Sequence, residues 1–405
     1  MLPEDISKLK SAEVKKFIGT VSNLDPTEII LRYHGNSDFP IKAIAEQIEC
    51  KKKASIKLKT IYTDELIFTT QSLEQSSSES AASFKSTLLQ GKNFIDITGG
   101  LGIDFCFISK NFETAIYCEQ DTVLAEIFDH NSRIMNCDNS IIRNEDGLKV
   151  LSEFDDNFFD WILVDPSRRK DGRRSVDLKY CTPNLIEHFE FLLKKGKKIL
   201  IKLSPAFDTK EAKKIFKGIT DFYIVSVDDE CKELLVIVDS NLKPIAVNIH
   251  SIIISNNRRR IFSKSDDEET VKHFSEAIKS NYIYIPNCSI IAADLTGKLA
   301  NQFSLDWFSF NTHLLHGKEF NPEFPGRILR IENVEGYNQK RLTRFLKLNE
   351  IKSANIICKN FGCKPEEMYK KLKIKTGGNV FIVLTRNNKN QLISIIAERI
   401  SQSSI

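Results

Sequence analysis

The chain has 405 residues, which is long for one domain and suits two to four, and 41% of them are hydrophobic, so large cores are easily buried. No apolar run approaches the ~18 residues of a membrane helix and no signal segment opens the chain, so we expect a soluble cytoplasmic protein and exclude a membrane-spanning one. The nine cysteines include no CxxC pair, which predicts reduced, buried thiols and no metal site.

Residues 1–71 are predicted to form a helical N-terminal domain. Ser11 and the Asp25-Pro26 pair are typical helix starts, and apolar residues recur at helical spacing across residues 41–48. The serine-rich stretch 72–86 then has the composition of a flexible linker, although it lies directly before the first predicted strand.

Residues 94–104 have the pattern of a first strand and the cofactor loop of a nucleoside-binding α/β domain. The loop glycines carry no Cβ, so the backbone can turn tightly and approach a ligand closely. A loop of this kind also occurs for packing reasons alone. Together with the strand ends described next, it points to S-adenosylmethionine, with predicted contacts at Asp96, Thr98, Gly99, Gly100, Gly102 and Asp104.

Two further apolar runs also end in carboxylates. Glu119 ends the second run, 23 residues after Asp96, and an acid there can accept hydrogen bonds from both ribose hydroxyls. The third run leads to Asp146, which can accept a hydrogen bond from an adenine amine. Each acid alone also suits a solvated strand end. The three acids together predict one adenosyl site, with Gln120 as a further contact.

Runs at residues 160–164 and 198–203 predict a fourth and a fifth strand, and helix-length segments between most of the runs favour a parallel sheet covered on both faces. Only six residues separate the runs at 222–227 and 234–238, too few for a parallel crossover, so these runs should form an antiparallel hairpin. This arrangement predicts an α/β fold with a Rossmann-like class I methyltransferase sheet. It disfavours the nicotinamide-binding fold, which ends in another parallel strand.

Five motifs in order resemble a bacterial family of class I methyltransferases: residues 72–79, 96–104, 165–169, 202–205 and 230–235. The resemblance covers most of the chain and implies small α+β domains after the sheet, one ferredoxin-like and one THUMP-like. It also implies that Gln75 and Ser76 lie on the cofactor side. The expected domains are 1–71 (helical), 72–242 (methyltransferase), 243–326 (connecting and ferredoxin-like) and 327–405 (basic and THUMP-like).

The predicted catalytic motif follows the fourth strand and consists of Asp165, Pro166, Ser167 and Arg168. Methylases of exocyclic amines commonly have an Asp or Asn here, followed by two prolines and an aromatic residue, and the acid orients the amine. In this chain Ser167 replaces the second proline and Arg168 replaces the aromatic residue. The motif therefore keeps the orienting acid but leaves the acceptor atom open.

Arginines gather just after this motif. Arg168 and Arg169, with Arg173 and Arg174 nearby, suit bidentate contacts with substrate phosphates. The alternative is that the cluster pairs with the nearby acids Asp171 and Asp177.

Charge is distributed unevenly along the chain. Residues 86–242 hold 21 basic and 27 acidic side chains, whereas residues 327–405 hold 16 and 6. A compact module with such an excess suits a polyanion, because the neutralisation of phosphates drives sequence-independent affinity. The alternative is a merely soluble basic face. The predicted RNA contacts in this module include Arg341, Arg344, Lys370 and Lys371.

These observations predict an S-adenosylmethionine-dependent methyltransferase that acts on structured RNA, either rRNA or tRNA, with Asp165 orienting the acceptor. Two alternatives stay open: a non-catalytic RNA-binding protein with a vestigial cofactor fold, and a nicotinamide-dependent oxidoreductase. A protein or small-molecule acceptor also stays open, because no motif names the nucleophile. The sequence indicates neither which RNA is modified nor the oligomeric state.

Overall fold

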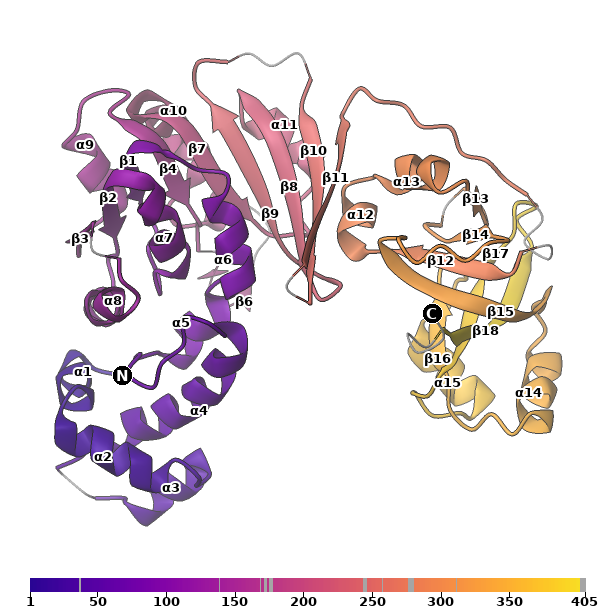
Figure 1. Cartoon of the computed structure of the whole chain (residues 1–405), viewed down its shortest axis with the longest axis horizontal. Helices are drawn as coiled ribbons and strands as arrows, with labels where there is room; N and C mark the ends of the chain where they lie inside the picture. The colour runs from indigo at the N-terminus through magenta and orange to yellow at the C-terminus, as the bar shows by residue number, and fades with distance from the viewer. Residues whose placement is uncertain are drawn as a thin grey trace. The chain divides into compact units, whose positions relative to one another are not determined.

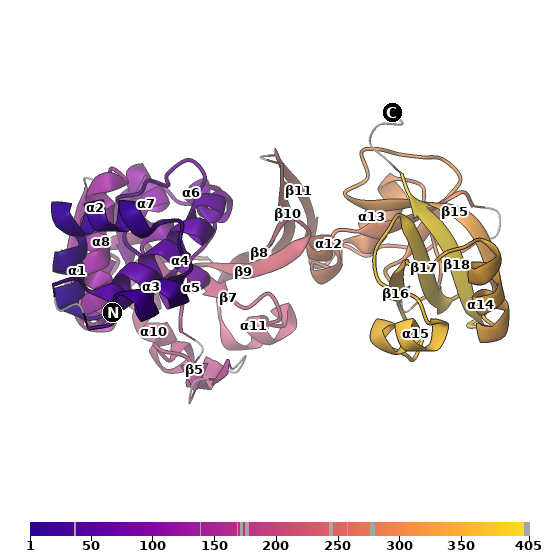
Figure 2. The same cartoon turned by 90° about the horizontal axis from the view of Figure 1, so that it is seen from below.

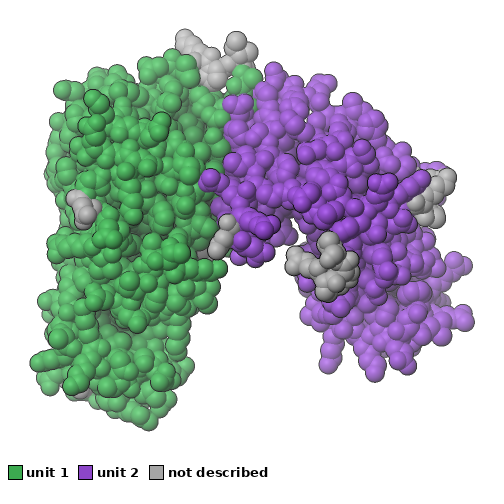
Figure 3. All heavy atoms as spheres, in the orientation of Figure 1, with its two compact units in different colours: residues 1–227, 232–247 green, residues 228–231, 248–405 purple. Residues whose placement is uncertain are grey.

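The computed structural model describes residues 1–35, 38–137, 139–167, 169–170, 173–174, 178–242, 246–256, 258–275, 280–310 and 312–400 (Figure 1). Contacts divide the chain into two compact units (Figure 3). The first contains residues 1–227 and 232–247, and the second contains residues 228–231 and 248–405. No helix in these ranges is long and apolar enough to cross a membrane.

Four helices open the first unit: α1 (Pro3–Leu9), α2 (Ala12–Val21), α3 (Pro26–Arg32) and α4 (Ile41–Lys57). The predicted helix starts are confirmed, because the side chains of Ser11 and Asp25 accept hydrogen bonds from the first turns of α2 and α3. The buried amide of Gln47 on α4 pairs with the backbone of Phe68, and that of Asn131 pairs with Ile67. These bonds fix the segment that leads into the next helices.

The serine-rich stretch is not a linker. It forms α5 (Thr70–Gln75) and α6 (Glu79–Ser86), each with a side-chain cap, from Thr69 and Ser78. Serine and threonine favour helix starts as strongly as they favour linkers, so composition alone cannot separate the two. The linker interpretation was therefore wrong.

A mainly parallel sheet forms the centre of the first unit, with the strand order β8-β9-β7-β4-β1-β2-β3. Strands β3, β2, β1, β4 and β7 run parallel, and β9 pairs antiparallel with β7. The predicted five parallel strands are thus confirmed. The strands are β1 (Gly91–Asp96), β2 (Phe112–Cys118), β3 (Ser140–Arg143), β4 (Phe159–Val164), β7 (Gly196–Leu203), β8 (Ile219–Val227) and β9 (Glu230–Asp239).

Helices alternate with these strands, and several begin on an acidic or amide cap directly after a strand. Asp121 caps α8 and Asp146 caps α9. The caps place polar side chains at the carboxyl ends of the strands, where ligands of parallel α/β sheets bind. The connecting helices are α7 (Ile103–Ile108), α8 (Thr122–Ile134), α9 (Gly147–Ser152), α10 (Leu185–Lys195) and α11 (Thr209–Ile215), and a two-stranded ribbon, β5 (Arg169–Lys170) and β6 (Arg173–Arg174), follows β4.

The predicted terminal hairpin is also present, with a tighter connection than expected. Only Asp228 and Asp229 separate β8 from β9, and both have positive φ angles, 52° and 62°. Two successive positive φ angles are the signature of a type I′ hairpin turn. Because β9 lies between β7 and β8, the sheet closes as expected for a class I methyltransferase rather than a nicotinamide-binding domain.

The second unit contains an antiparallel pair, β10 (Asn248–Ser255) and β11 (Arg258–Ser265), and a seven-stranded sheet with the order β13-β14-β12-β15-β18-β17-β16. Helices α14 and α15 bury Leu342, Leu346, Met368 and Leu372 against one face of this sheet (Figure 2). The elements are β12 (Tyr282–Pro286), α12 (Cys288–Ala292), α13 (Thr296–Gln302), β13 (Asp306–Trp307), β14 (Leu315–Gly317), β15 (Gly326–Gly336), α14 (Gln339–Leu348), β16 (Asn355–Cys358), α15 (Pro365–Leu372), β17 (Val380–Arg386) and β18 (Leu392–Arg399).

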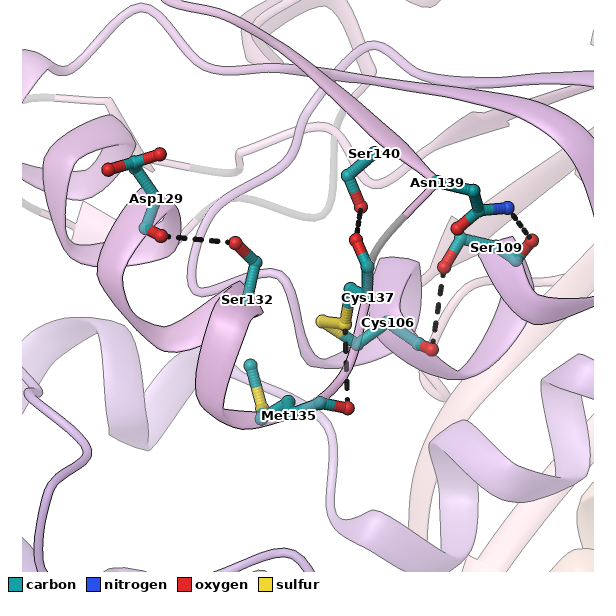
Figure 4. Close-up of a disulfide and its surroundings, with 8 residues drawn as sticks. All are labelled: Cys106, Ser109, Asp129, Ser132, Met135, Cys137, Asn139 and Ser140. Carbon is teal, nitrogen blue, oxygen red and sulfur yellow. Dashed lines mark hydrogen bonds between the residues drawn. A yellow bond between two sulfur atoms is a disulfide. The ribbon is translucent and has the colours of Figure 1, made fainter.

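One sequence-based expectation about the cysteines was wrong. Cys106 on α7 and Cys137 just after α8 form a disulfide with a Cα–Cα distance of 5.5 Å (Figure 4). The other seven cysteines form no disulfide. The two partners are 31 residues apart in sequence and meet only because the fold brings the two helix ends together, so no short motif could reveal the pair.

Candidate active site

Asp96 ends β1 and is almost completely buried, with 3% of its surface exposed. Its Oδ1 accepts hydrogen bonds from the backbone N–H of Thr98 (2.9 Å) and from the Thr98 hydroxyl (3.3 Å). Burial, with the negative charges of Asp104 and Asp165, raises the pKa of Asp96 to about 7 despite these bonds. Asp96 can therefore change its charge near neutral pH.

Glu119 follows β2 and binds the backbone of the glycine-rich loop, residues 99–102. Its Oε2 accepts from the N–H of Gly100 at 2.8 Å, and its Oε1 accepts from the N–H of Asp121 at 2.9 Å. A carboxylate oxygen has more than one acceptor direction, so both oxygens keep capacity for a ligand hydroxyl. The loop and the end of β2 thus form one polar surface, as the sequence predicted.

The three loop glycines have different structural roles. A Cβ on Gly99 would lie 2.2 Å from the ring of Tyr117, and one on Gly102 would lie 2.1 Å from the ring of Phe128. These two rings stack with centroids 3.8 Å apart. On Gly100, with φ of +56°, the nearest neighbour of a Cβ would be the Thr98 carbonyl oxygen at 3.9 Å, an ordinary contact distance. Gly99 and Gly102 therefore make room for core packing, whereas the Cα of Gly100 is uncrowded, and the predicted cofactor contacts of all three stay predictions.

Asp146 lies beyond β3 at the same edge of the sheet. Its Oδ1 caps α9 by accepting from Leu148, and its Oδ2 accepts from the side-chain amide of Gln120 at 2.9 Å. Gly147 packs directly on Ile97, which follows β1. The predicted residues Gln120 and Asp146 are thus brought together, beside the segment that follows Asp96.

Behind these strand ends lies a buried ionic cluster that we call the lysine cluster, formed by Lys85, Lys202, Asp104, Asp165, Glu233 and Ser77. The ammonium of Lys202 lies 2.6 Å from Asp165 Oδ2 and 3.5 Å from Asp104 Oδ2. Lys85, with no exposed surface, lies 2.7 Å from Glu233 Oε1 and 3.1 Å from Asp104 Oδ1. Two cations face three carboxylates.

The cluster favours the charged forms of Lys202 and Asp104. Although burial opposes it, the carboxylates of Asp165, Asp104 and Glu233 raise the pKa of Lys202 well above its usual value. Burial likewise acts to raise the pKa of Asp104, but the charges of Lys85 and Lys202 lower it overall. Such pairs are stable in a protein interior only when every charge has a partner.

Sequence reasoning missed Lys85, Lys202, Glu233 and Ser77 as site residues. Ser77 donates a hydrogen bond to Asp104 Oδ2 at 2.8 Å, directly after the predicted contacts Gln75 and Ser76, which end α5. One signal was the lysine at position 202 within the buried apolar part of this strand, residues 199–203, because lysine is almost never fully buried unless it is paired.

The predicted catalytic motif is only partly described. The backbone N–H of Asp165 donates to the Thr98 hydroxyl at 2.7 Å, which ties the end of β4 to the end of β1. Pro166 is buried, and Ser167 is exposed and pairs with Thr182 through its backbone. Arg168 lies outside the described residues, as do Asp171 and Asp177. Arg169 is described only by its backbone in β5, so its predicted phosphate contact stays a prediction.

The predicted RNA contacts of the C-terminal module lie on two neighbouring helices. Arg341 and Arg344 are exposed on α14, and Lys370 and Lys371 are exposed on α15. Both helices pack on the same face of the sheet (Figure 2). The described part of the chain contains no cluster of His, Cys, Asp and Glu that suits a metal ion.

Comparisons with known proteins agree with this architecture. Residues 326–399 match the family described as "THUMP domain-like". The chain is similar to the "putative methyltransferase from Porphyromonas gingivalis W83", with a TM-score of 0.83 and 26% identity over 99% of this chain and 100% of that one. The fold is that of a methyltransferase.

Curated relatives point in the same direction. The chain is 20% identical over 332 residues to proteins named "Uncharacterized S-adenosylmethionine-dependent methyltransferase" in Mycobacterium tuberculosis strains CDC 1551 and H37Rv, which covers 82% of this chain and 87% of each relative. These findings confirm the predicted resemblance, the methyltransferase class and the THUMP-like C-terminal domain. The names of these relatives give S-adenosylmethionine as the methyl donor, which is the predicted cofactor.

Proposed function

We propose that this protein is an S-adenosylmethionine-dependent methyltransferase that modifies structured RNA, with its site at the carboxyl ends of β1, β2, β3 and β4. The observation that carries the proposal is the gathering of Asp96, Glu119 and Asp146 at the ends of adjacent parallel strands, next to the uncrowded Cα of Gly100. The relatives' names and the similar fold support the enzyme class.

The residues at this edge fit the proposed cofactor. Glu119 keeps acceptor capacity for ribose hydroxyls and Asp146 for an adenine amine, and Gly100 offers space without a Cβ. The lysine cluster holds three carboxylates against two ammonium groups, and Asp96 adds a further acid. The site therefore has an excess of negative charge, which suits a ligand with a positively charged sulfur.

S-adenosylmethionine, when bound, supplies a methyl group activated by its sulfonium. The reaction would form a bond from the acceptor atom to the methyl carbon and break the carbon–sulfur bond, whose electron pair would stay on sulfur. An amine acceptor would also release one proton to solvent water. The task of this chain is then positioning, because the reacting atoms must approach within about 3 to 3.5 Å in line. We assign Asp165, which is partly exposed after β4, to orient the acceptor.

RNA is the proposed acceptor because of the C-terminal module. Its residues 327–405 carry 16 basic and 6 acidic side chains, and the match to a THUMP-like family falls on nearly the same residues. On this sheet an open cavity of about 400 Å³ lies beside Phe381 and is flanked by Arg327 and Arg399. Guanidinium groups at the edge of this cavity suit the phosphates of RNA.

The experiment that tests this proposal is transfer of labelled methyl from S-adenosylmethionine to total RNA from cells that lack the protein, followed by mapping of the modified nucleotide. We expect label in one RNA class with the wild-type chain and at least about a hundredfold less with Asp165→Ala, which removes the orienting oxygens. RNA binding without any transfer would favour the vestigial-fold alternative. Transfer to protein or small molecules alone would contradict the RNA assignment.

A further inference from the structure

We propose that Lys202 is a positioning residue that holds Asp165 in place at the end of β4, with one carboxylate oxygen left to face the methyl acceptor. The inference rests on the proposed function, because it concerns how the orienting acid is held. Lys202 is part of β7, and the register places it beside Asp165, since Val164 of β4 pairs with Ile201.

Asp165 is held at two points. Its Oδ2 accepts from the Lys202 ammonium at 2.6 Å, and its backbone N–H donates to the Thr98 hydroxyl at 2.7 Å. Thr98 is in turn bonded to Asp96. The Asp165 side chain is 32% exposed, and its Oδ1 forms no hydrogen bond or ion pair with a residue that the structure describes. One oxygen is thus fixed and the other is available.

Lys202 cannot easily move away from this position. It is only 8% exposed, and its ammonium also lies 3.3 Å from Ser77 Oγ and 3.9 Å from Glu233 Oε2. Contacts on several sides fix the ammonium, so the carboxylate that it binds is fixed as well. A short charge-assisted hydrogen bond of this kind is stronger than a neutral one.

The second buried lysine provides a matched control. Lys85 binds Glu233, Asp104 and Ser77 in the same cluster but makes no contact with Asp165 among the described residues. Loss of either lysine leaves one ammonium group to face three carboxylates in the protein interior, which destabilises the fold. Only loss of Lys202 also releases Asp165.

The charge around Asp165 decides the expected pH effect. Lys202 on β7 and Asp96 on β1 interact with Asp165 directly. Lys85 on α6, Asp104 on α7 and Glu233 on β9 complete the lysine cluster, and Lys57 on α4 interacts with Lys202 and Asp104. Among the described residues Lys202 is the cation that pairs with Asp165, so its loss removes that charge from beside the carboxylate. A carboxylate that loses an adjacent cation takes up a proton more readily, so the pH below which methyl transfer fails should rise.

The test compares Lys202→Met with Lys85→Met in the full-length protein, with total RNA from cells lacking the protein as the substrate and single-turnover methyl transfer as the readout. For Lys202→Met we expect a rate of methyl transfer about a hundredfold lower at pH 7. The pH below which transfer fails should also rise by about one unit or more. For Lys85→Met we expect a lower melting temperature and no change in the pH below which transfer fails.

The inference would be overturned if Lys202→Met kept both the wild-type rate and the wild-type pH below which methyl transfer fails. It would also be overturned if that pH rose equally in Lys85→Met. If Lys202→Met does not fold, Lys202→Arg takes its place, because it keeps the charge on a larger planar group. The arginine variant should lose at least about tenfold in rate and keep the wild-type pH below which transfer fails, and a wild-type rate would refute precise positioning.

A readout without substrate separates this inference from the proposed function. The carboxyl ¹³C signal of Asp165, assigned with Asp165→Asn, should titrate at a higher pH in Lys202→Met than in Lys85→Met. If it does so while no RNA is methylated, the role of Lys202 stands and the RNA assignment fails. If both variants titrate as the wild type does, the inference itself is wrong.

Discussion

Asp96 offers a prediction that links its burial to cofactor binding. Burial raises the pKa of Asp96 from 3.8 to about 7, so the folded protein holds a proton there that the unfolded chain loses near pH 4. Because the pKa is raised on folding, the proton on Asp96 contributes to the free energy of unfolding. The contribution is fully present below about pH 4, is lost as the pH rises to about 7, and amounts to about 4 kcal/mol.

A positively charged ligand next to Asp96 favours its ionised form. At pH 7 about half of the molecules carry the proton, so binding of S-adenosylmethionine should release about 0.5 proton per site. If only the ionised form binds, the affinity should be about 30-fold lower at pH 5.5 than at pH 8. S-adenosylhomocysteine lacks the sulfonium charge and should show a smaller dependence.

Calorimetry in buffers of different ionisation enthalpy measures this proton release. The matched variant is Asp96→Asn, which keeps the size of the side chain and an oxygen that can accept from Thr98. We expect it to bind without the 0.5-proton release and with an affinity nearly independent of pH. Equal proton release in the variant and the wild type would refute the link between Asp96 and the charge of the cofactor.

Two further predictions concern the basic helices and the cysteines. The double variant Arg344→Glu with Lys371→Glu should lower RNA affinity at least about tenfold in a filter-binding assay. In a plot of the logarithm of the binding constant against the logarithm of the salt concentration, the slope should become less steep by about 2. The exposed pair Lys15→Glu with Lys16→Glu on α2 is the control, and an equal loss there would contradict a specific surface. We substitute residues instead of removing the chain from residue 327 onward, because that truncation would remove most of β15, which pairs with β12 in the same sheet. In the unfolded protein, thiol titration before reduction should give seven thiols rather than the nine in the sequence, and nine would exclude the Cys106–Cys137 disulfide.

The sequence was sufficient where the signal is local. Each parallel strand is a short apolar run with a polar residue at its end, and parallel strands place those ends at one edge, so Asp96, Glu119 and Asp146 could be predicted to lie together. The helix starts at Ser11 and Asp25 were equally local, since a cap acts within its own first turn.

The sequence was insufficient where partners come from distant segments. Lys85 and Glu233 are 148 residues apart and meet only in the folded chain, and a lysine in isolation is expected to be exposed. The glycines show the same limit. A glycine that makes room for an aromatic ring, such as Gly99 beside Tyr117, looks in sequence like one that approaches a ligand.

The most direct test of the shared site is equilibrium binding of S-adenosylmethionine and of NAD to the full chain, in the wild type and in Glu119→Gln. We expect one S-adenosylmethionine per chain, no measurable NAD binding, and a loss of at least about tenfold in the variant, because a charge-assisted bond to a ribose hydroxyl contributes about 1.5–3 kcal/mol. Preference for NAD, or an unchanged affinity in Glu119→Gln, would contradict a methyl-donor site at the ends of these strands.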